Sequence, residues 1–282
     1  MHAIFKIIIF LGTAFCLSEI TLHKAFAQMP VASIAAFDYP PYIAANEPKG
    51  GLVGEIVLDS FALEGQMVEL EFLPTNRFVA TAFNGPKSAC FISTSKNIKR
   101  LSTKDQQQVI SSPPLAQITM VLVAYQSNKK PTPKFNAIED LAGSSVIAIR
   151  GSNYTTSLLA AGAAVQEAPI ESQLRMLKFG RADFALMGDL VARQIIQKFS
   201  PADSENFILL PKQVDTLNLI FACNRNHPEG QALFDRFKIG FQNLYKSGRY
   251  RKLLNAYYGD NLSQEYEKNM SVLAAPWSPS PP

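Results

Sequence analysis

Short apolar runs alternate with amphipathic segments along this chain, and that order limits its possible folds more than any other feature. Residues 31–36 and 88–93 are predicted to be buried strands, and 67–73 alternates apolar and polar side chains as a half-buried strand does. Helical spacing over 52–62 and a helix expected from 74 to about 83 separate these runs. Strand-helix-strand order of this kind predicts a parallel sheet with helices on its faces.

A polar stretch over 94–112 and a buried strand over 118–124 lead into a second series of the same kind. The expected elements, in chain order, are a helix at 138–141, a strand at 146–149, helices ending near 163 and 179, a strand at 182–187, a helix at 190–198 and a strand at 207–210. A further strand at 217–223 precedes an almost wholly helical segment, 228–258. The chain is therefore predicted to form two α/β units in series, with final helices that return to one of them.

The first 27 residues have the pattern of a cleavable secretory signal. Lys6 precedes an apolar run over 7–16, which is too short to cross a bilayer, and Ala25-Phe26-Ala27 is a small-x-small cleavage site. We therefore expect cleavage after Ala27 and export to the periplasm. The proline-rich end, 275–282, is expected to be disordered.

Charge and metal-ligand content narrow the function classes. Of 27 basic and 23 acidic residues, two and one lie in the signal, which leaves 25 and 22 and a net charge of +3. These charges are spread without a run of Lys and Arg, so the sequence gives no indication of nucleic acid binding. Cys90, Cys223 and His227 would lack a fourth ligand for zinc, so no metal site is predicted.

The stretch Phe37-Asp38-Tyr39-Pro40-Pro41-Tyr42 follows the first strand directly. Proline cannot donate to a sheet ladder and fixes its own φ, so the pair ends the strand and stiffens the loop. The rings of Phe37, Tyr39 and Tyr42 are thus held at the carboxyl end of a strand, the edge at which ligands bind in open α/β sheets. They are interpreted either as one wall of a ligand cleft or as a cap on the core, and the loop alone does not separate these two readings.

The order of motifs over about residues 31–260 resembles the bacterial periplasmic solute-binding proteins of family 3, the amino-acid-binding type. The motifs are the loop 37–42, Gly51 with Asp59, Pro74 to Arg77 with Gly85, 96–100, Ser112-Pro113-Pro114, Leu141-Ala142-Gly143, 147–152, Gly180-Arg181-Ala182-Asp183, and Gly248-Arg249-Tyr250 with Tyr257-Tyr258-Gly259. Each motif is weak by itself, and the ordered set is far more specific than any member.

This resemblance implies an α/β protein of the two-lobed type II periplasmic-binding-protein fold, in which each lobe is a mostly parallel sheet flanked by helices and two strands form a hinge. Lobe 1 would contain residues 28–114 and 216–282, and lobe 2 would contain 115–215. The implied function is a monomeric, cofactor-free protein that closes on a small polar ligand, an amino acid or related carboxylate, and delivers it to an ABC-type transporter in the inner membrane.

The same resemblance assigns the carboxylate-binding groups. Arg100 lies in the segment that is similar to the family's ligand-binding arginine and offers a planar, bidentate fork to a carboxylate. Arg77, which ends the motif Pro74 to Arg77, is the second arginine that the resemblance assigns to the site. The turn Gly151-Ser152-Asn153, between a strand and a helix, offers backbone N–H groups at a helix start. Without the family pattern, an arginine in a polar loop such as Arg100 is usually only a solvated surface residue, and Lys99 and Lys104 are its rivals.

Asp189 is the candidate acceptor for a ligand ammonium, and Phe37, Tyr39 and Tyr42 would supply stacking and cation–π contact. Asp189 stands one position later than the aspartate of the family pattern, where Gly188 lies instead. If Asp189 does not reach the cleft, a buried ammonium would lack a partner, and a ligand other than an α-amino acid is expected.

Two alternatives to transport stay open: a stand-alone sensory protein, and an exported enzyme on the same fold, such as a dehydratase of small carboxylic acids. Glu55 and Asp59 are at helical spacing and are the carboxylate pair that such an enzyme could use. Cys90 and Cys223 are placed by the family topology as neighbours in one sheet, where either a disulfide or two buried thiols would fit.

Overall fold

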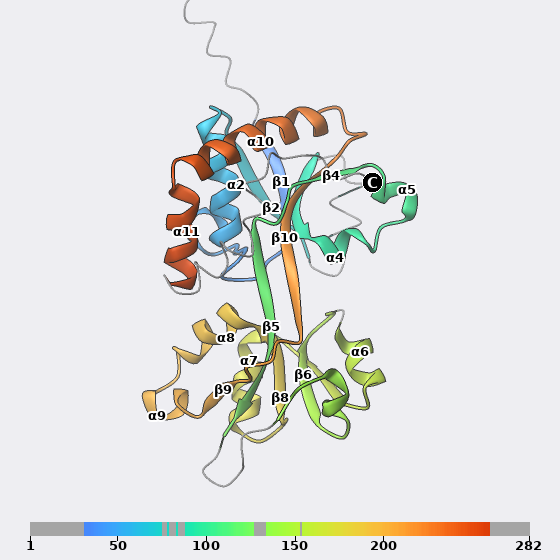
Figure 1. The fold of residues 1–282 in the computed structure, drawn as a ribbon, viewed down its shortest axis with the longest axis vertical. Helices are drawn as coiled ribbons and strands as arrows, with labels where there is room; N and C mark the ends of the chain where they lie inside the picture. The colour runs from blue at the N-terminus through green and yellow to red at the C-terminus, as the bar shows by residue number, and fades with distance from the viewer. Residues whose placement is uncertain are drawn as a thin grey trace, which may run out of the picture.

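The computed structural model describes residues 31–74, 78, 83, 88–126, 134–152 and 154–259. The expected signal segment, most of the helix expected over 74–83 and the proline-rich tail lie outside these residues. Figure 1 shows two bodies, one above the other, connected by the long strands β5 (Ala116–Tyr125) and β10 (Asp215–Asn224). Within the described ranges, no helix combines the length and the hydropathy needed to cross a membrane.

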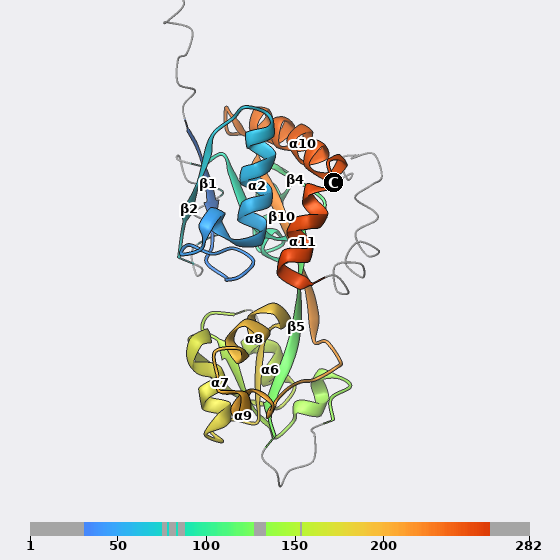
Figure 2. The same cartoon turned by 90° about the vertical axis from the view of Figure 1, so that its left-hand side faces the viewer.

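The first lobe, the upper body in Figure 1, contains the chain up to β5 and the chain after β10. Its strands are β1 (Ala32–Ala36), β2 (Val68–Phe72), β3 (Cys90–Thr94) and β4 (Val109–Ser111). Its helices are η1 (Pro48–Gly50), α2 (Gly51–Leu63), α4 (Ser95–Ile98), α5 (Thr103–Gln106), α10 (Gly230–Lys246) and α11 (Arg249–Tyr258). Figure 2 shows α2, α10 and α11 gathered on one side of this lobe, as the helical spacing of 228–258 requires if its apolar stripe is to be buried.

The second lobe, the lower body, contains the chain between the two long strands. Its elements are η2 (Ile138–Leu141), β6 (Ser145–Ile149), α6 (Tyr154–Ala160), β7 (Ala164–Ala168), α7 (Ile170–Lys178), β8 (Phe184–Gly188), α8 (Asp189–Ile196), α9 (Pro201–Ser204) and β9 (Phe207–Leu209). The buried strand β8 is apolar on both faces, as expected for a strand covered by helices on each side.

Hydrogen bonding runs through all strands in the order β2-β1-β3-β10-β5-β8-β6-β7, with β4 added to β10 and β9 added to β5. Within the first lobe β1, β2 and β3 are parallel, and within the second β6, β7 and β8 are parallel. The two long strands are antiparallel to their neighbours. The predicted α/β class, with a mostly parallel sheet in each lobe, is therefore confirmed.

Each long strand belongs to both lobes. Strand β10 pairs with β3 through Leu219–Cys223 and with β5 through Asp215–Leu219. Strand β5 pairs with β10 through Ala116–Met120 and then with β8 through Met120–Val123. The lobes are thus connected by one antiparallel pair, which is the geometry of a two-strand hinge.

The sequence prediction missed several short elements. Residues 94–112 were expected as a polar loop but form α4, α5 and β4, because four-residue helices and a three-residue strand are too short to show a period. Strand β7 was also missed, since an edge strand with mostly exposed residues lacks an apolar run. The helix expected to reach 163 ends at Ala160.

Cys90 and Cys223 form a disulfide in the first lobe. They face each other in the antiparallel register of β3 and β10, with 3.9 Å between their Cα atoms, and both are fully buried. The bond closes a loop of 133 residues in sequence, which contains the whole second lobe. It therefore ties the returning strand to the sheet that the chain left before entering that lobe.

Candidate functional site

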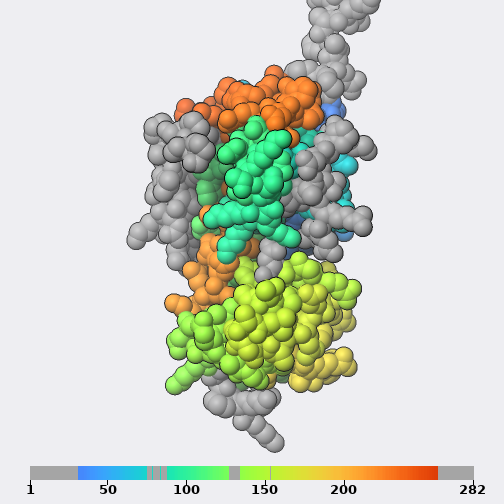
Figure 3. Space-filling view, turned by 90° about the vertical axis from the view of Figure 1, so that its right-hand side faces the viewer, coloured from blue at the N-terminus to red at the C-terminus, as the bar shows by residue number. Residues whose placement is uncertain are grey.

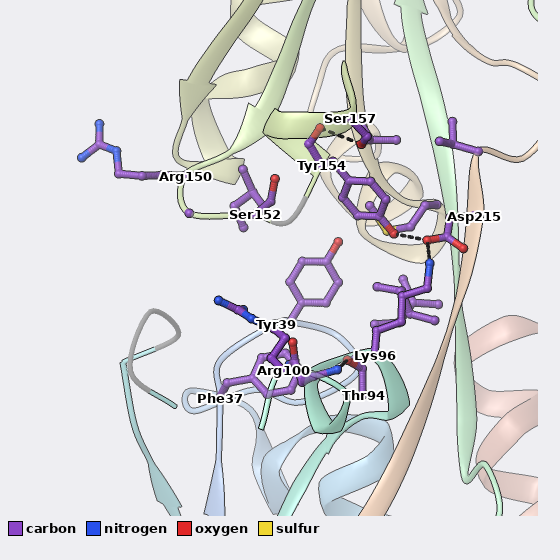
Figure 4. A pocket seen from close by; sticks show the side chains of 18 of the residues that line it. Phe37, Tyr39, Thr94, Lys96, Arg100, Arg150, Ser152, Tyr154, Ser157 and Asp215 are labelled. Carbon is purple, nitrogen blue, oxygen red and sulfur yellow. Dashed lines mark hydrogen bonds and ion pairs between the residues drawn. The ribbon is translucent and has the colours of Figure 1, made fainter. Parts of the chain in front are cut away.

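A cavity of about 570 Å³ lies between the two lobes, beside the hinge strands. The first lobe contributes the end of β1 and the segment around α4, and the second contributes the end of β6, α6 and β8. Figure 3 shows the α4–α5 segment, in green, directly above the atoms of the second lobe, and Figure 4 shows the side chains that converge from both sides. The cavity is lined by Phe37, Asp38, Tyr39, Thr94, Lys96, Asn97, Arg100, Ile118, Met120, Ile138, Ile149, Arg150, Gly151, Ser152, Tyr154, Ser157, Leu186, Val214, Asp215 and Leu217.

The aromatic loop has two roles, divided among its three rings. Phe37 and Tyr39 line the cavity, which places them on the ligand-facing side of the loop. Tyr42 is fully buried and does not line it. Its ring lies 6.1 Å from that of Tyr39, with 11° between the ring planes. Of the two readings of this loop, the cleft wall therefore fits Phe37 and Tyr39, whereas Tyr42 packs in the core.

Both tyrosine hydroxyls reach across to the second lobe at the junction of β8 and α8. The Gly188 N–H donates to Tyr39 Oη at 3.0 Å, and Tyr42 Oη donates to Asp189 Oδ1 at 2.8 Å. Burial is the main cause that raises the pKa of Tyr39, to about 12, so its hydroxyl stays protonated at neutral pH. The stacked pair is thus a direct bridge between the lobes.

Asp189 does not line the cavity. Asp189 is 9% exposed and is the first residue of α8. Burial raises the pKa of Asp189, and the hydrogen bond from Tyr42 offsets only part of that effect. The predicted ammonium acceptor is therefore directed to Tyr42 in this structure and away from the cleft.

Arg100 lines the cavity from the segment that follows α4. Its guanidinium has no hydrogen-bond or ion-pair partner among the described residues. Its rivals Lys99 and Lys104 do not line the cavity. Arg77 and Asn153, the other two polar candidates, lie outside the described residues.

The turn after β6 brings Gly151 and Ser152 to the cavity, Gly151 in the left-handed region at φ 74°. The Ser152 N–H donates to the Ile149 carbonyl at 3.0 Å. This N–H, which was expected to bind a ligand carboxylate, is therefore already used inside the turn. Ser152 Oγ, in contrast, is buried without a hydrogen-bond partner among the described residues. Within the described part of this turn, the Ser152 hydroxyl, unlike the Ser152 N–H, is thus a polar group without a partner.

Sequence reasoning missed a cluster of three polar side chains at the start of β10. Asp215 Oδ2 accepts a hydrogen bond from Tyr154 Oη at 2.7 Å and forms an ion pair with Lys96. Asp215 Oδ1 accepts from the Thr216 N–H at 2.8 Å. Figure 4 shows this cluster at one side of the cavity, with one member from each lobe and one from the hinge. The available signal was an acid two residues before a predicted strand, which is too common to single out.

Electrostatics in this cluster are balanced internally. Burial raises the pKa of Asp215, but the hydrogen bonds from Lys96 and Tyr154 outweigh it, and the net effect lowers that pKa. Burial and the neighbouring Asp215 raise the pKa of Tyr154 well above its usual range. At neutral pH the cluster therefore contains an ionised carboxylate, an ammonium and a neutral phenol.

The carboxylates considered for an enzyme lie elsewhere. Glu55 and Asp59, on α2, do not line the cavity. Lys49 lies 2.8 Å from a Glu55 oxygen, and Arg249 lies 2.6 Å from an Asp59 oxygen. These two acids therefore belong to an ion-pair network that joins α2 to the loop before it and to α11.

No protein-family model and no curated protein sequence matches this chain. Solved structures of similar fold include the GluR0 ligand-binding core from Nostoc punctiforme in complex with L-glutamate, at 16% identity and a TM-score of 0.62, covering 81% of this chain and 100% of that one. A histidine kinase sensor domain with similarity to periplasmic binding proteins matches at 20% identity and a TM-score of 0.63, over 82% and 96% of the two chains. The substrate binding protein of an amino acid ABC transporter matches at 15% identity and a TM-score of 0.59, over 81% and 100%.

These neighbours are matched over almost their full length, and they confirm at the level of the fold the resemblance that the motifs indicate. The identities are too low to transfer a ligand. The chain has the two-lobed fold of the periplasmic solute-binding proteins and of sensor domains similar to them.

Proposed function

We propose that this protein is a periplasmic solute-binding protein that closes on a small carboxylate-bearing ligand, an amino acid or a related acid, and delivers it to an ABC-type transporter. The observation that carries this proposal is the interlobe cavity, whose lining includes Arg100 from the first lobe and Ser152 from the second; neither the guanidinium nor the Ser152 hydroxyl has a hydrogen-bond partner among the described residues. A carboxylate between Arg100 and Ser152 would satisfy both groups at once.

Closure follows from the same geometry. Because the two groups lie on different lobes, a ligand that bonds both favours the conformation in which the lobes approach each other. We propose that the hinge lies in the β5–β10 pair, with lobe 1 formed by 28–114 and 216–282 and lobe 2 by 115–215. Export after cleavage behind Ala27 and a monomeric state belong to the same proposal.

Binding without bond chemistry is favoured by the acids of the cavity. A carboxyl group that acts as a general acid or base must be free to exchange a proton with the substrate, and its pKa should lie near the working pH. Asp215 is instead held ionised by Lys96 and Tyr154, and Asp38 is exposed. A sensory role is the second candidate, favoured by the match to a kinase sensor domain.

The test is a thermal-shift screen of residues 28–282 against amino acids, amines and small carboxylates, followed by mass spectrometry of the bound compound. We expect a compound that raises the melting temperature and is recovered unaltered. Recovery of a product would favour the exported enzyme instead. Interaction with a permease, assayed by stimulation of its ATPase activity, separates transport from sensing.

Arg100→Gln tests the site. A charge-assisted hydrogen bond contributes about 1.5–3 kcal/mol, so affinity should fall by a factor of about 10 to 150. Lys99→Gln is the matched control, since it removes one neighbouring charge that does not line the cavity. Equal affinities of the two variants would refute the assignment of Arg100.

A further inference from the structure

We infer that the ligand of this cavity is an organic anion with an apolar body and no ammonium group. This inference rests on the proposed function and narrows its ligand class. It rests on which acids and cations around the cavity already have partners in the protein.

The end of β8 has no acid to offer. Gly188 faces the Tyr39 hydroxyl so closely that a Cβ atom there would lie 3.2 Å from that oxygen and 2.9 Å from Ile118. A side chain at this position would collide with Ile118 and crowd the Tyr39 hydroxyl. Asp189, one residue later, is buried and accepts the Tyr42 hydroxyl. This acid is thus displaced by one residue from the family pattern, and the hydroxyls of Tyr39 and Tyr42 bond the end of β8 and Asp189 instead.

The two acids that do line the cavity are poor partners for an ammonium. Asp215 already has Lys96, Tyr154 and the Thr216 N–H on its two oxygens. The Ala45 N–H donates to Asp38 Oδ1 at 2.9 Å, and Asp38 is exposed. A charge pair formed there would remain in contact with water, where such pairs contribute little.

The cations show the opposite balance. Of the residues that the structure describes, Lys96, Arg100 and Arg150 line the cavity with these two acids, an excess of one positive charge. Figure 4 shows the Arg150 side chain pointing away from the other labelled groups, whereas Arg100 lies among them beside Tyr39. Among the described lining residues, the Arg100 guanidinium and the Ser152 hydroxyl are thus polar groups without a hydrogen-bond partner, and both suit a carboxylate.

The remaining lining is largely apolar. Side chains from both hinge strands and from each lobe contribute to it: Phe37, Ile118, Met120, Leu186, Val214 and Leu217. Burial of apolar ligand surface against such walls is favourable, at about 25 cal/mol for each Å². A volume of about 570 Å³ accommodates an acid with a branched or aromatic body.

The experiment compares ligands that differ only in the ammonium group, with residues 28–282 of the protein. The pairs are 3-phenylpropionate against L-phenylalanine, and 4-methylpentanoate against L-leucine, with phenethylamine as the compound that has only the amine. We expect each acid to raise the melting temperature and to bind at least tenfold more tightly than its amino acid by calorimetry. Phenethylamine should produce no shift.

Two variants make the test specific. Arg100→Gln should weaken binding of the acids by a factor of about 10 to 150, while Lys99→Gln should leave it unchanged. Asp38→Asn should strengthen binding of the acids, by up to about fivefold, because it removes an exposed negative charge near the anion. If the wild type binds L-phenylalanine or L-leucine and Asp38→Asn loses that binding, this acid holds a ligand ammonium and the inference is overturned.

Failure of this inference can be told apart from failure of the proposed function. Tighter binding of an amino acid or an amine than of the matched acid overturns the inference and leaves a solute-binding protein. The same holds if neither acid binds but another compound of the wider screen does. Absence of any stabilising compound in the wider screen refutes the proposed function itself.

Discussion

The bridge between Tyr42 and Asp189 makes a sharp prediction about stability. Tyr42→Phe deletes the hydroxyl that donates to Asp189 Oδ1 at 2.8 Å and leaves the ring in place between Tyr39 and Tyr258. A hydrogen bond to a charged group contributes about 1.5–3 kcal/mol, so unfolding at neutral pH should become easier by about that amount. For a protein of this size that corresponds to a fall of roughly 3–12 °C in melting temperature.

The effect should depend on pH, and its sign follows from the Asp189 pKa. Burial raises that pKa above the ordinary value of an aspartate, so the folded state binds the proton more tightly than the unfolded state does. Stability therefore falls as pH rises from about 4 through the folded-state pKa. The Tyr42 hydroxyl lowers this pKa, so its loss raises the pKa further and enlarges the fall. The destabilisation by Tyr42→Phe should be smallest near pH 4 and largest at neutral pH.

Urea denaturation of the wild type and the variant, at pH 4 and pH 7.5, measures this difference. Tyr250→Phe is the matched control, because the Tyr250 hydroxyl is buried and donates to the neutral Leu115 carbonyl at 2.8 Å. Its cost of about 0.5–1.5 kcal/mol should be the same at both pH values. If Tyr42→Phe also costs the same at pH 4 and pH 7.5, the reasoning that the Tyr42 hydroxyl lowers the pKa of a buried Asp189 is refuted.

Two further predictions concern the first lobe. Replacing Cys90 and Cys223 together by Ala should lower stability by about 2–5 kcal/mol in denaturation, since the disulfide constrains a 133-residue loop; an unchanged midpoint would contradict this. Gly240→Ala should cost about 1–3 kcal/mol, because its Cβ would lie 1.8 Å from the Ser60 carbonyl oxygen where α10 crosses α2. The neighbouring Ile239→Ala, at a position 50% exposed, should change stability by less than about 0.5 kcal/mol, and equal effects of the two would refute this packing argument.

Local patterns in the sequence determined the class of fold. Alternating apolar runs and helical spacing predicted the strands and helices of both lobes, because burial on one face imposes the period of each element. The Pro-Pro pair predicted the end of the first strand, and two prolines need no distant partner to stop a ladder. The motif order added the two-lobed arrangement, and it placed Phe37, Tyr39, Arg100 and the Gly151 turn at one cleft.

The tertiary structure alone decided which polar groups remain free in that cleft. Asp189 bonds Tyr42 across 147 residues of sequence, and Asp215 bonds Tyr154 across 61 and Lys96 across 119. None of these pairs leaves a periodic trace, because a hydrogen bond needs only that two groups lie within about 3 Å once the chain has folded. The sequence does not distinguish an acid that is hydrogen-bonded to a tyrosine from an acid that is free to bind a ligand. Hydrophobic periodicity therefore specifies the scaffold, whereas the charge that a ligand meets depends on long-range pairs that only the folded chain brings together.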